Sequence, residues 1–182
     1  MDLAKPAILP HAVYTVKRTL NRFGKYLASC SLCVLLAGCD YSVPLVETPT
    51  APIDVAVLGT WEQTLDSGKV QRLLVLPMNA FEYLVVFPAK SDYALFARAC
   101  LWEGPSGTLA QLDWFGTEDG AVPDDEVTFQ FATYSLDNDR LTIRLLNPNT
   151  VSKSSAPSNE LKSAIAANRS HPKLFRKAMV FH

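Results

Sequence analysis

The sequence predicts a mainly β protein: a small antiparallel up-and-down barrel of about eight strands with one C-terminal α-helix, behind an N-terminal leader. Three observations predict it. Short apolar runs separated by turn residues recur from residue 58 onward. Within several runs apolar and polar residues alternate, as in strands that bury one face. The first 38 residues are instead a basic stretch followed by an uncharged apolar one, so they are left out of the expected domain.

The leader has the composition of a secretory signal. Its basic residues come first, namely Lys17, Arg18, Arg22 and Lys25. An uncharged, mostly apolar run of 13 residues follows, from Tyr26 to Gly38. A membrane-spanning helix needs roughly 20 apolar residues, so this run is too short to remain in the bilayer. We therefore expect residues 1–38 to be a signal peptide.

Residues 39–56 show no periodicity and carry Pro44, Pro49 and Pro52. This composition is typical of an extended linker. We expect a flexible tether here, followed by a barrel domain over residues 57–182.

Seven segments of the domain are expected to form strands: 59–64, 70–76, 83–87, 93–102, 108–115, 127–136 and 141–145. The last of them alternates strictly, with Leu141, Ile143 and Leu145 apolar. The segment 127–136 changes polarity after Phe131, which predicts a bulge or sharp bend near Ala132 and Thr133. The segment 93–102 is apolar on both faces, so we expect a cover on each, with the C-terminal helix as one of them.

The helix is expected over residues 158–168. Ser158 is a suitable N-cap, and Leu161 and Ile165 lie four residues apart on one face. Residues 174–181 are expected to return as the eighth strand and close the barrel without free edges.

Charge and cysteine content change once the leader is removed. The whole chain has net charge −1, whereas residues 39–182 hold 12 basic and 17 acidic side chains, or −5. A net acidic domain argues against nucleic acid as a partner. Cys30 and Cys33 leave with the leader, so Cys39 and Cys100 remain. We expect Cys100 to be a small buried apolar residue, with a reactive or intermolecular thiol as the alternative.

The motif Leu36-Ala37-Gly38-Cys39 resembles the lipobox of bacterial lipoproteins. The resemblance implies cleavage before Cys39 and attachment of a diacylglycerol and an acyl chain, such as palmitate, to that residue. It implies a protein held on the extracytoplasmic side of a cell membrane by two or three chains, which anchor stably. With Cys39 lipidated, no disulfide can form within the mature chain. Asp40 resembles the signal that retains such proteins in the inner membrane.

The segment Gly59-Thr60-Trp61 resembles the G-x-W start of lipocalin-like (calycin) barrels. Together with the segment from Tyr41 to Leu45 and the C-terminal helix, it is similar to an uncharacterised group of bacterial lipoproteins. In lipocalins this tryptophan packs beneath an arginine, and the resemblance implies Arg144 or Arg176 for that position.

No catalytic motif stands out. The chain lacks a nucleophile elbow and a phosphate-binding loop, and His171 and His182 lack metal-ligand spacing. We predict no enzyme, no cofactor and no metal. Five carboxylates crowd one loop, where a solvated loop is favoured over a Ca²⁺ site: Glu118, Asp119, Asp124, Asp125 and Glu126. Arg98 is expected either to pair a ligand carboxylate or to serve the fold.

These features favour a lipid-anchored cell-envelope protein whose barrel is a binding or interaction module, with the membrane and an envelope protein as partners. The alternative is a carrier that holds a small apolar or lipid-like molecule inside the barrel. A third hypothesis is an enzyme that uses carboxylates which no motif reveals. The candidate ligand-binding or core residues are Trp61, Phe87, Phe96, Arg98, Trp102, Phe129 and Phe131.

Overall fold

A computed structural model describes residues 40–105, 107–118, 120–121, 128–152 and 157–182. The expected signal peptide, its Leu36-Ala37-Gly38-Cys39 motif and most of the acidic loop lie outside the described residues. Gly38–His182 forms one compact unit. In the part of the chain that the structure describes, no helix is long and apolar enough to cross a membrane.

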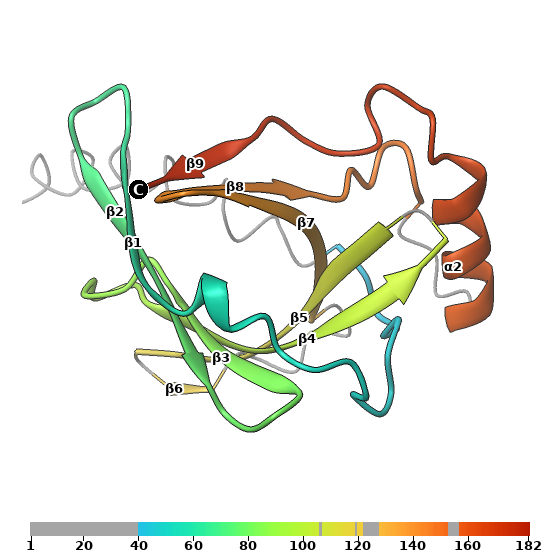
Figure 1. Cartoon of the computed structure of the whole chain (residues 1–182), viewed down its shortest axis with the longest axis horizontal. Helices are drawn as coiled ribbons and strands as arrows, with labels where there is room; N and C mark the ends of the chain where they lie inside the picture. Colours follow the sequence, from blue (N-terminus) through green and yellow to red (C-terminus); the bar gives the residue numbers. More distant parts are fainter. Residues whose placement is uncertain (1–39, 106, 119, 122–127, 153–156) are drawn as a thin grey trace, which may run out of the picture. The chain divides into compact units, whose positions relative to one another are not determined.

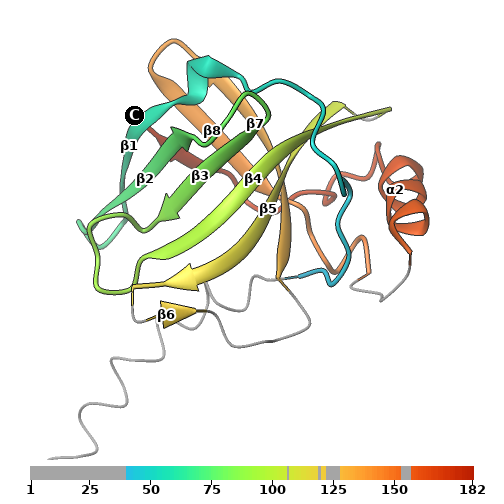
Figure 2. The same cartoon turned by 90° about the horizontal axis from the view of Figure 1, so that it is seen from below.

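The unit is a nearly closed antiparallel up-and-down barrel (Figures 1 and 2). Its strands are β1 (Gly59–Thr64), β2 (Val70–Pro77), β3 (Glu82–Phe87), β4 (Leu95–Gly104), β5 (Gly107–Thr117), β6 (Gly120–Ala121), β7 (Phe129–Asp137), β8 (Arg140–Leu145) and β9 (Met179–Phe181). They pair in chain order, except that the short β6 pairs only with the end of β5. The expected fold class is confirmed.

The barrel closes between its first and last strands. The Glu62 N–H donates to the His182 carbonyl at 2.8 Å, and the His182 N–H donates to the Glu62 carbonyl at 2.9 Å. β9 is shorter than the expected segment 174–181, but Phe175 adds an isolated bridge to Leu146. The C-terminal residues therefore seal the seam next to β1.

Side chains fill the inside of the barrel. We call this set the inner core; its buried members are Val57, Leu73, Val75, Tyr83, Val85, Ala97, Ala99, Leu101, Trp114, Leu141 and Phe181. Phe181 is 1 % exposed and meets Phe87 edge-on, with ring centroids 6.0 Å apart. The alternation expected in β8 is confirmed for Leu141 and Ile143, which join the inner core, whereas Leu145 is half-buried outside it.

A second cluster covers the outside of β4, β5 and β7. We call it the outer cluster; its buried members are Tyr41, Leu45, Leu109, Phe131, Leu146, Val151, Leu161, Ile165 and Leu174. Helix α2 (Ser158–Ala167) contributes Leu161 and Ile165. Trp102 of β4 packs against this cluster, whereas Leu101 points inward. The expected cover on both faces of β4 is therefore confirmed only in part, because Arg98 on the outer face is exposed.

The start of α2 differs from the expectation. Ser158 is its first residue, and Pro157 holds the N-cap position without a side-chain hydrogen bond. Proline pre-sets a backbone angle compatible with a helix start, so a hydroxyl cap is not needed to begin the helix.

The change of polarity in β7 does not come from a bulge, one of the two causes expected. The register of β7 shows no shift in its pairs with β5 or β8; its partner changes from β5 to β8 at Ala132. Phe131 faces the outer cluster, while Tyr134 and Leu136 face the inner core. The apolar residues change sides because the outer cover ends partway along the strand. A register shift does occur between Phe96 and Ala97 of β4.

Residues 40–56 do not form the expected flexible tether. We call residues 40–58 the N-terminal strap, because they run along the barrel wall and end at the 3-10 helix η1 (Val55–Val57) beside β1 (Figures 1 and 2). Tyr41 and Leu45 are 1 % and 2 % exposed. Val57 joins the inner core, so the strap covers one end of the barrel.

Candidate functional site

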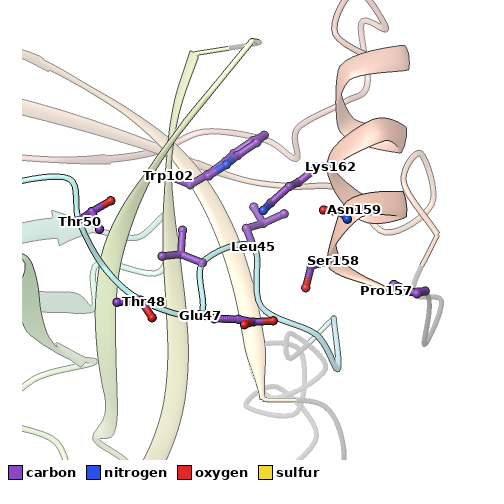
Figure 3. A pocket seen from close by; sticks show the side chains of 10 residues that line it. Leu45, Glu47, Thr48, Thr50, Trp102, Pro157, Ser158, Asn159 and Lys162 are labelled. Atoms are coloured by element: carbon purple, nitrogen blue, oxygen red, sulfur yellow. The ribbon is translucent and has the colours of Figure 1, made fainter.

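A groove of about 530 Å³ lies outside the barrel, between the N-terminal strap, the end of β4 and the first turn of α2. Its lining residues are Leu45, Val46, Glu47, Thr48, Thr50, Trp102, Pro157, Ser158, Asn159 and Lys162. Figure 3 shows Lys162 reaching from α2 toward Trp102 and Leu45. The groove thus combines an aromatic face, an aliphatic floor, one cation and one anion, which suits a ligand that is partly apolar and partly polar.

Gln111 of β5 holds the strap side of the groove in place. Its Oε1 accepts from the Leu45 and Val46 N–H groups at 2.6 and 2.8 Å, and its Nε2 donates to the Val46 carbonyl at 2.9 Å. The side chain is 6 % exposed. An amide can act as donor and acceptor at once, so one side chain satisfies three backbone groups of a segment that has no strand partner there.

Trp102 is positioned by its own strand. Gly104 lies two residues further along β4, and a Cβ at that position would collide with the indole ring of Trp102. The absent side chain therefore gives the indole room to lie along the strand end, where it lines the groove.

Five of the aromatic candidate residues, which would line the cavity of a carrier, do not all lie in one place. Phe87 packs against the inner core, and Phe96 belongs to a small third cluster with Val86, Ala89 and Ala94. Trp102, Phe129 and Phe131 belong to the outer cluster or pack against it. Within the described residues the set is divided among three clusters on both faces of the sheet, and of these five only Trp102 lines the groove.

Trp61, Arg98 and Arg176 contact residues of the barrel wall or the strap and do not line the groove. Trp61 packs against the inner core, and its Nε1–H donates to the Val57 carbonyl at 2.9 Å, which ties η1 to β1. Arg98 points outward, with 58 % of its side chain exposed, and its Nε lies 3.5 Å from a Glu82 oxygen. Arg176, one of the two arginines implied for Trp61, forms an ion pair with Asp40.

Three polar side chains meet near η1. The Asp54 N–H donates to the Tyr83 hydroxyl at 2.5 Å, and the Tyr134 hydroxyl donates to Asp54 Oδ2 at 3.2 Å. Burial raises the pKa of both phenols, and the Asp54 charge raises them further. Both tyrosines therefore stay protonated at neutral pH. The cluster holds η1 against the barrel.

Cys100 is the cysteine of the described residues, and it is 4 % exposed. Burial, with smaller contributions from Glu82 and Asp113, raises the pKa of its thiol to about 11. The expectation of a buried apolar residue is met. A raised pKa disfavours the thiolate, which is the reactive form.

The thiol should therefore be inert in the folded protein. In a variant with serine at positions 30, 33 and 39, Cys100 is the remaining thiol. We expect maleimide to label it at pH 8 at least about 100-fold more slowly in the folded protein than in urea. Adding Thr48→Cys, at an exposed position, supplies the control and should give one rapidly labelled thiol per chain. Equal labelling rates at Cys100 and at the thiol introduced at position 48 would contradict the burial.

Sequence reasoning missed two features of the groove. Gln111 and Lys162 carry no motif, and the strap residues were assigned to a tether. The signal that could have revealed the strap is its apolar content, since Tyr41, Leu45 and Val46 are unusual in a solvated linker. Among the described residues no three of His, Cys, Asp or Glu gather at one place. Asp119, Asp124, Asp125 and Glu126 lie outside the described residues.

Comparison of the chain with models of known protein families, with curated proteins and with solved structures finds no match.

Proposed function

We propose that this chain is a lipid-anchored protein of the bacterial cell envelope whose small β-barrel is a binding or interaction module. The observation that carries the anchor is the Leu36-Ala37-Gly38-Cys39 motif at the end of a basic and apolar leader. Asp40 and Tyr41, which directly follow the motif, pack against the barrel.

The proposal includes the lipocalin-like resemblance, which the up-and-down barrel opening on Gly59-Thr60-Trp61 supports. It also includes the inner membrane as the location, on the ground that Asp40 follows the lipidated cysteine. The extracytoplasmic side is expected because a lipobox directs export.

The groove around Trp102 supports an interaction module more than a carrier. The inner core occupies the barrel with side chains, and the aromatic residues that a carrier would need lie in separate clusters. The groove instead lies outside the barrel, beside the strap and α2. Its partner would contact Trp102 and Lys162 from the exterior.

Palmitate labelling in the native host tests the anchor. We expect the wild-type chain to incorporate label and to fractionate with membranes, and Cys39→Ser to do neither. Cys100→Ser is the matched control, because it removes a cysteine outside the motif and should label normally. Labelling that persists in Cys39→Ser would overturn the lipid anchor.

Site-specific photocross-linking tests the interaction module. A photoreactive residue replaces Lys162 in the groove, and in a second variant it replaces Lys69, an exposed lysine of the β1–β2 turn. We expect a discrete adduct from position 162 and none from position 69, and we expect Trp102→Ala to weaken it at least fivefold. Identical patterns from both positions, or no adduct at either, would rule out the groove as the binding site.

A further inference from the structure

Charge is separated along the mature chain. Residues 161–182 contain five lysines and arginines and no aspartate or glutamate, whereas residues 39–160 contain 7 basic and 17 acidic side chains. The five cations are Lys162, Arg169, Lys173, Arg176 and Lys177. We call residues 161–177 the basic segment. An acidic protein that concentrates its cations in one segment presents a local surface of opposite sign to the rest.

The basic segment lies beside the point where the strap begins. Arg176 forms an ion pair with Asp40, whose side chain is 2 % exposed. One loop also holds both segments: the Tyr41 hydroxyl donates to the Val151 carbonyl at 2.9 Å, and the Thr150 hydroxyl donates to the Lys173 carbonyl at 2.8 Å. The strap start and the basic segment are therefore parts of one packed surface.

The start of the strap is fixed to the barrel wall. Asp40 and Tyr41 both donate backbone N–H groups to the Phe129 carbonyl, at 3.0 and 3.2 Å, and the Phe129 N–H donates to the Tyr41 carbonyl at 3.0 Å. The Tyr41 ring contacts Phe131, with centroids 5.0 Å apart. On a flexible tether over residues 40–56, the lipid could lie up to about 60 Å from the barrel. With Asp40 fixed to the wall, the Cα atom of the lipidated residue lies instead about 3.8 Å from that of Asp40. A lipid attached one residue before Asp40 is thus held close to this surface.

We propose that the basic segment, which lies beside the buried start of the strap, docks on a bilayer that contains anionic phospholipids. The inference rests on the proposed lipid anchor and adds an orientation to it. A lysine or arginine held near an anionic membrane strengthens binding about fivefold. Lys173 and Lys177 are exposed and available to headgroups. Lipid chains and a basic surface together provide two membrane signals on one side of the barrel.

Fluorescence quenching tests the orientation in the lipidated mature protein. In a Cys100→Ser background, a fluorophore is attached at Ser170→Cys, an exposed turn in the basic segment, or at Ser67→Cys in the β1–β2 turn. Figures 1 and 2 place the β1–β2 hairpin on the opposite side of the barrel from α2. In vesicles of phosphatidylcholine and phosphatidylglycerol with nitroxide-labelled headgroups, we expect at least threefold stronger quenching at position 170.

Charge variants supply the matched control. The double substitution Lys173→Gln and Lys177→Gln should reduce the difference in quenching between positions 170 and 67 at least twofold. Vesicles of phosphatidylcholine alone should reduce this difference by a similar factor. Lys69→Gln with Lys90→Gln changes the net charge equally at exposed sites outside the basic segment and should leave the difference unchanged. Equal quenching at both positions, or equal effects of the two lysine pairs, would overturn the docked orientation.

The outcome separates this inference from the proposed anchor. If the protein carries the lipid and floats with vesicles in high salt but shows equal quenching at both positions, the lipid anchor is supported and the docked orientation is refuted. Protein that lacks the lipid refutes the anchor. The same quenching measurement on that protein, bound to anionic vesicles at low salt, still decides whether the basic segment faces the bilayer.

Discussion

Replacing Phe181 with alanine is expected to lower the free energy of unfolding by about 3–5 kcal/mol, the range for removing a buried phenylalanine. Phe181 is 1 % exposed, stands in the inner core and meets Phe87 edge-on. It also belongs to β9, which closes the seam beside β1, so the lost packing falls where three residue pairs join the last strand to β8. Urea unfolding followed by tryptophan fluorescence measures the change.

Phe115→Ala is the control for this prediction. Phe115 lies in β5 with 51 % of its surface exposed, so its replacement should change the free energy of unfolding by no more than about 0.5 kcal/mol. If the two variants lose similar stability, or if Phe181→Ala loses less than about 1 kcal/mol, the closed seam and its packing are wrong.

Replacing Arg176 with methionine is expected to lower the free energy of unfolding by about 3 kcal/mol. This is the lower end of the range for breaking a buried ion pair, because the Arg176 side chain is 32 % exposed and partly screened by water while that of Asp40 is 2 % exposed. Methionine keeps most of the apolar stem and removes the charge. The loss comes from a buried carboxylate that no longer faces its cation, and chemical denaturation measures it.

Two comparisons make this prediction specific. Adding Asp40→Asn to Arg176→Met should recover part of the loss, because the buried charge is removed with its partner. Arg72→Met breaks the pair with Glu62, in which 36 % and 50 % of the two side chains are exposed, and should cost at most about 1 kcal/mol. Similar losses from Arg72→Met and Arg176→Met would show that the Asp40 pair is no more important than a surface pair.

The fold could be predicted because the sequence pattern of each strand and turn is contained in a short segment. β8 alternates residue by residue, and the turns between strands carry glycine, proline, asparagine or aspartate. β4 is recognisable as apolar on both faces because Ala97 and Leu101 share the strand with Cys100 and Trp102. Each of these signals lies within ten residues, a distance over which periodicity can be read.

The strap could not be predicted because its partners are distant. Its prolines and threonines have the composition of a tether, and nothing near Leu45 in the sequence indicates that the Gln111 amide, 66 residues away, will satisfy its backbone. The Asp40–Arg176 pair spans 136 residues. The cause of the polarity change in β7 could not be predicted for the same reason, since the cover over Phe131 comes from α2 and the strap. Local pattern identified the strands, and long-range packing decided what covers them.

The seam between β1 and β9 also sets the timing of folding. Glu62 hydrogen-bonds with His182, which lies 120 residues further along the chain, so the barrel cannot close until β9 has been synthesised. Contacts between such distant residues make folding slow, because the intervening chain must be ordered first. Throughout that interval the segment around Asp40 also lacks Arg176, so the start of the strap is not yet held against the basic segment.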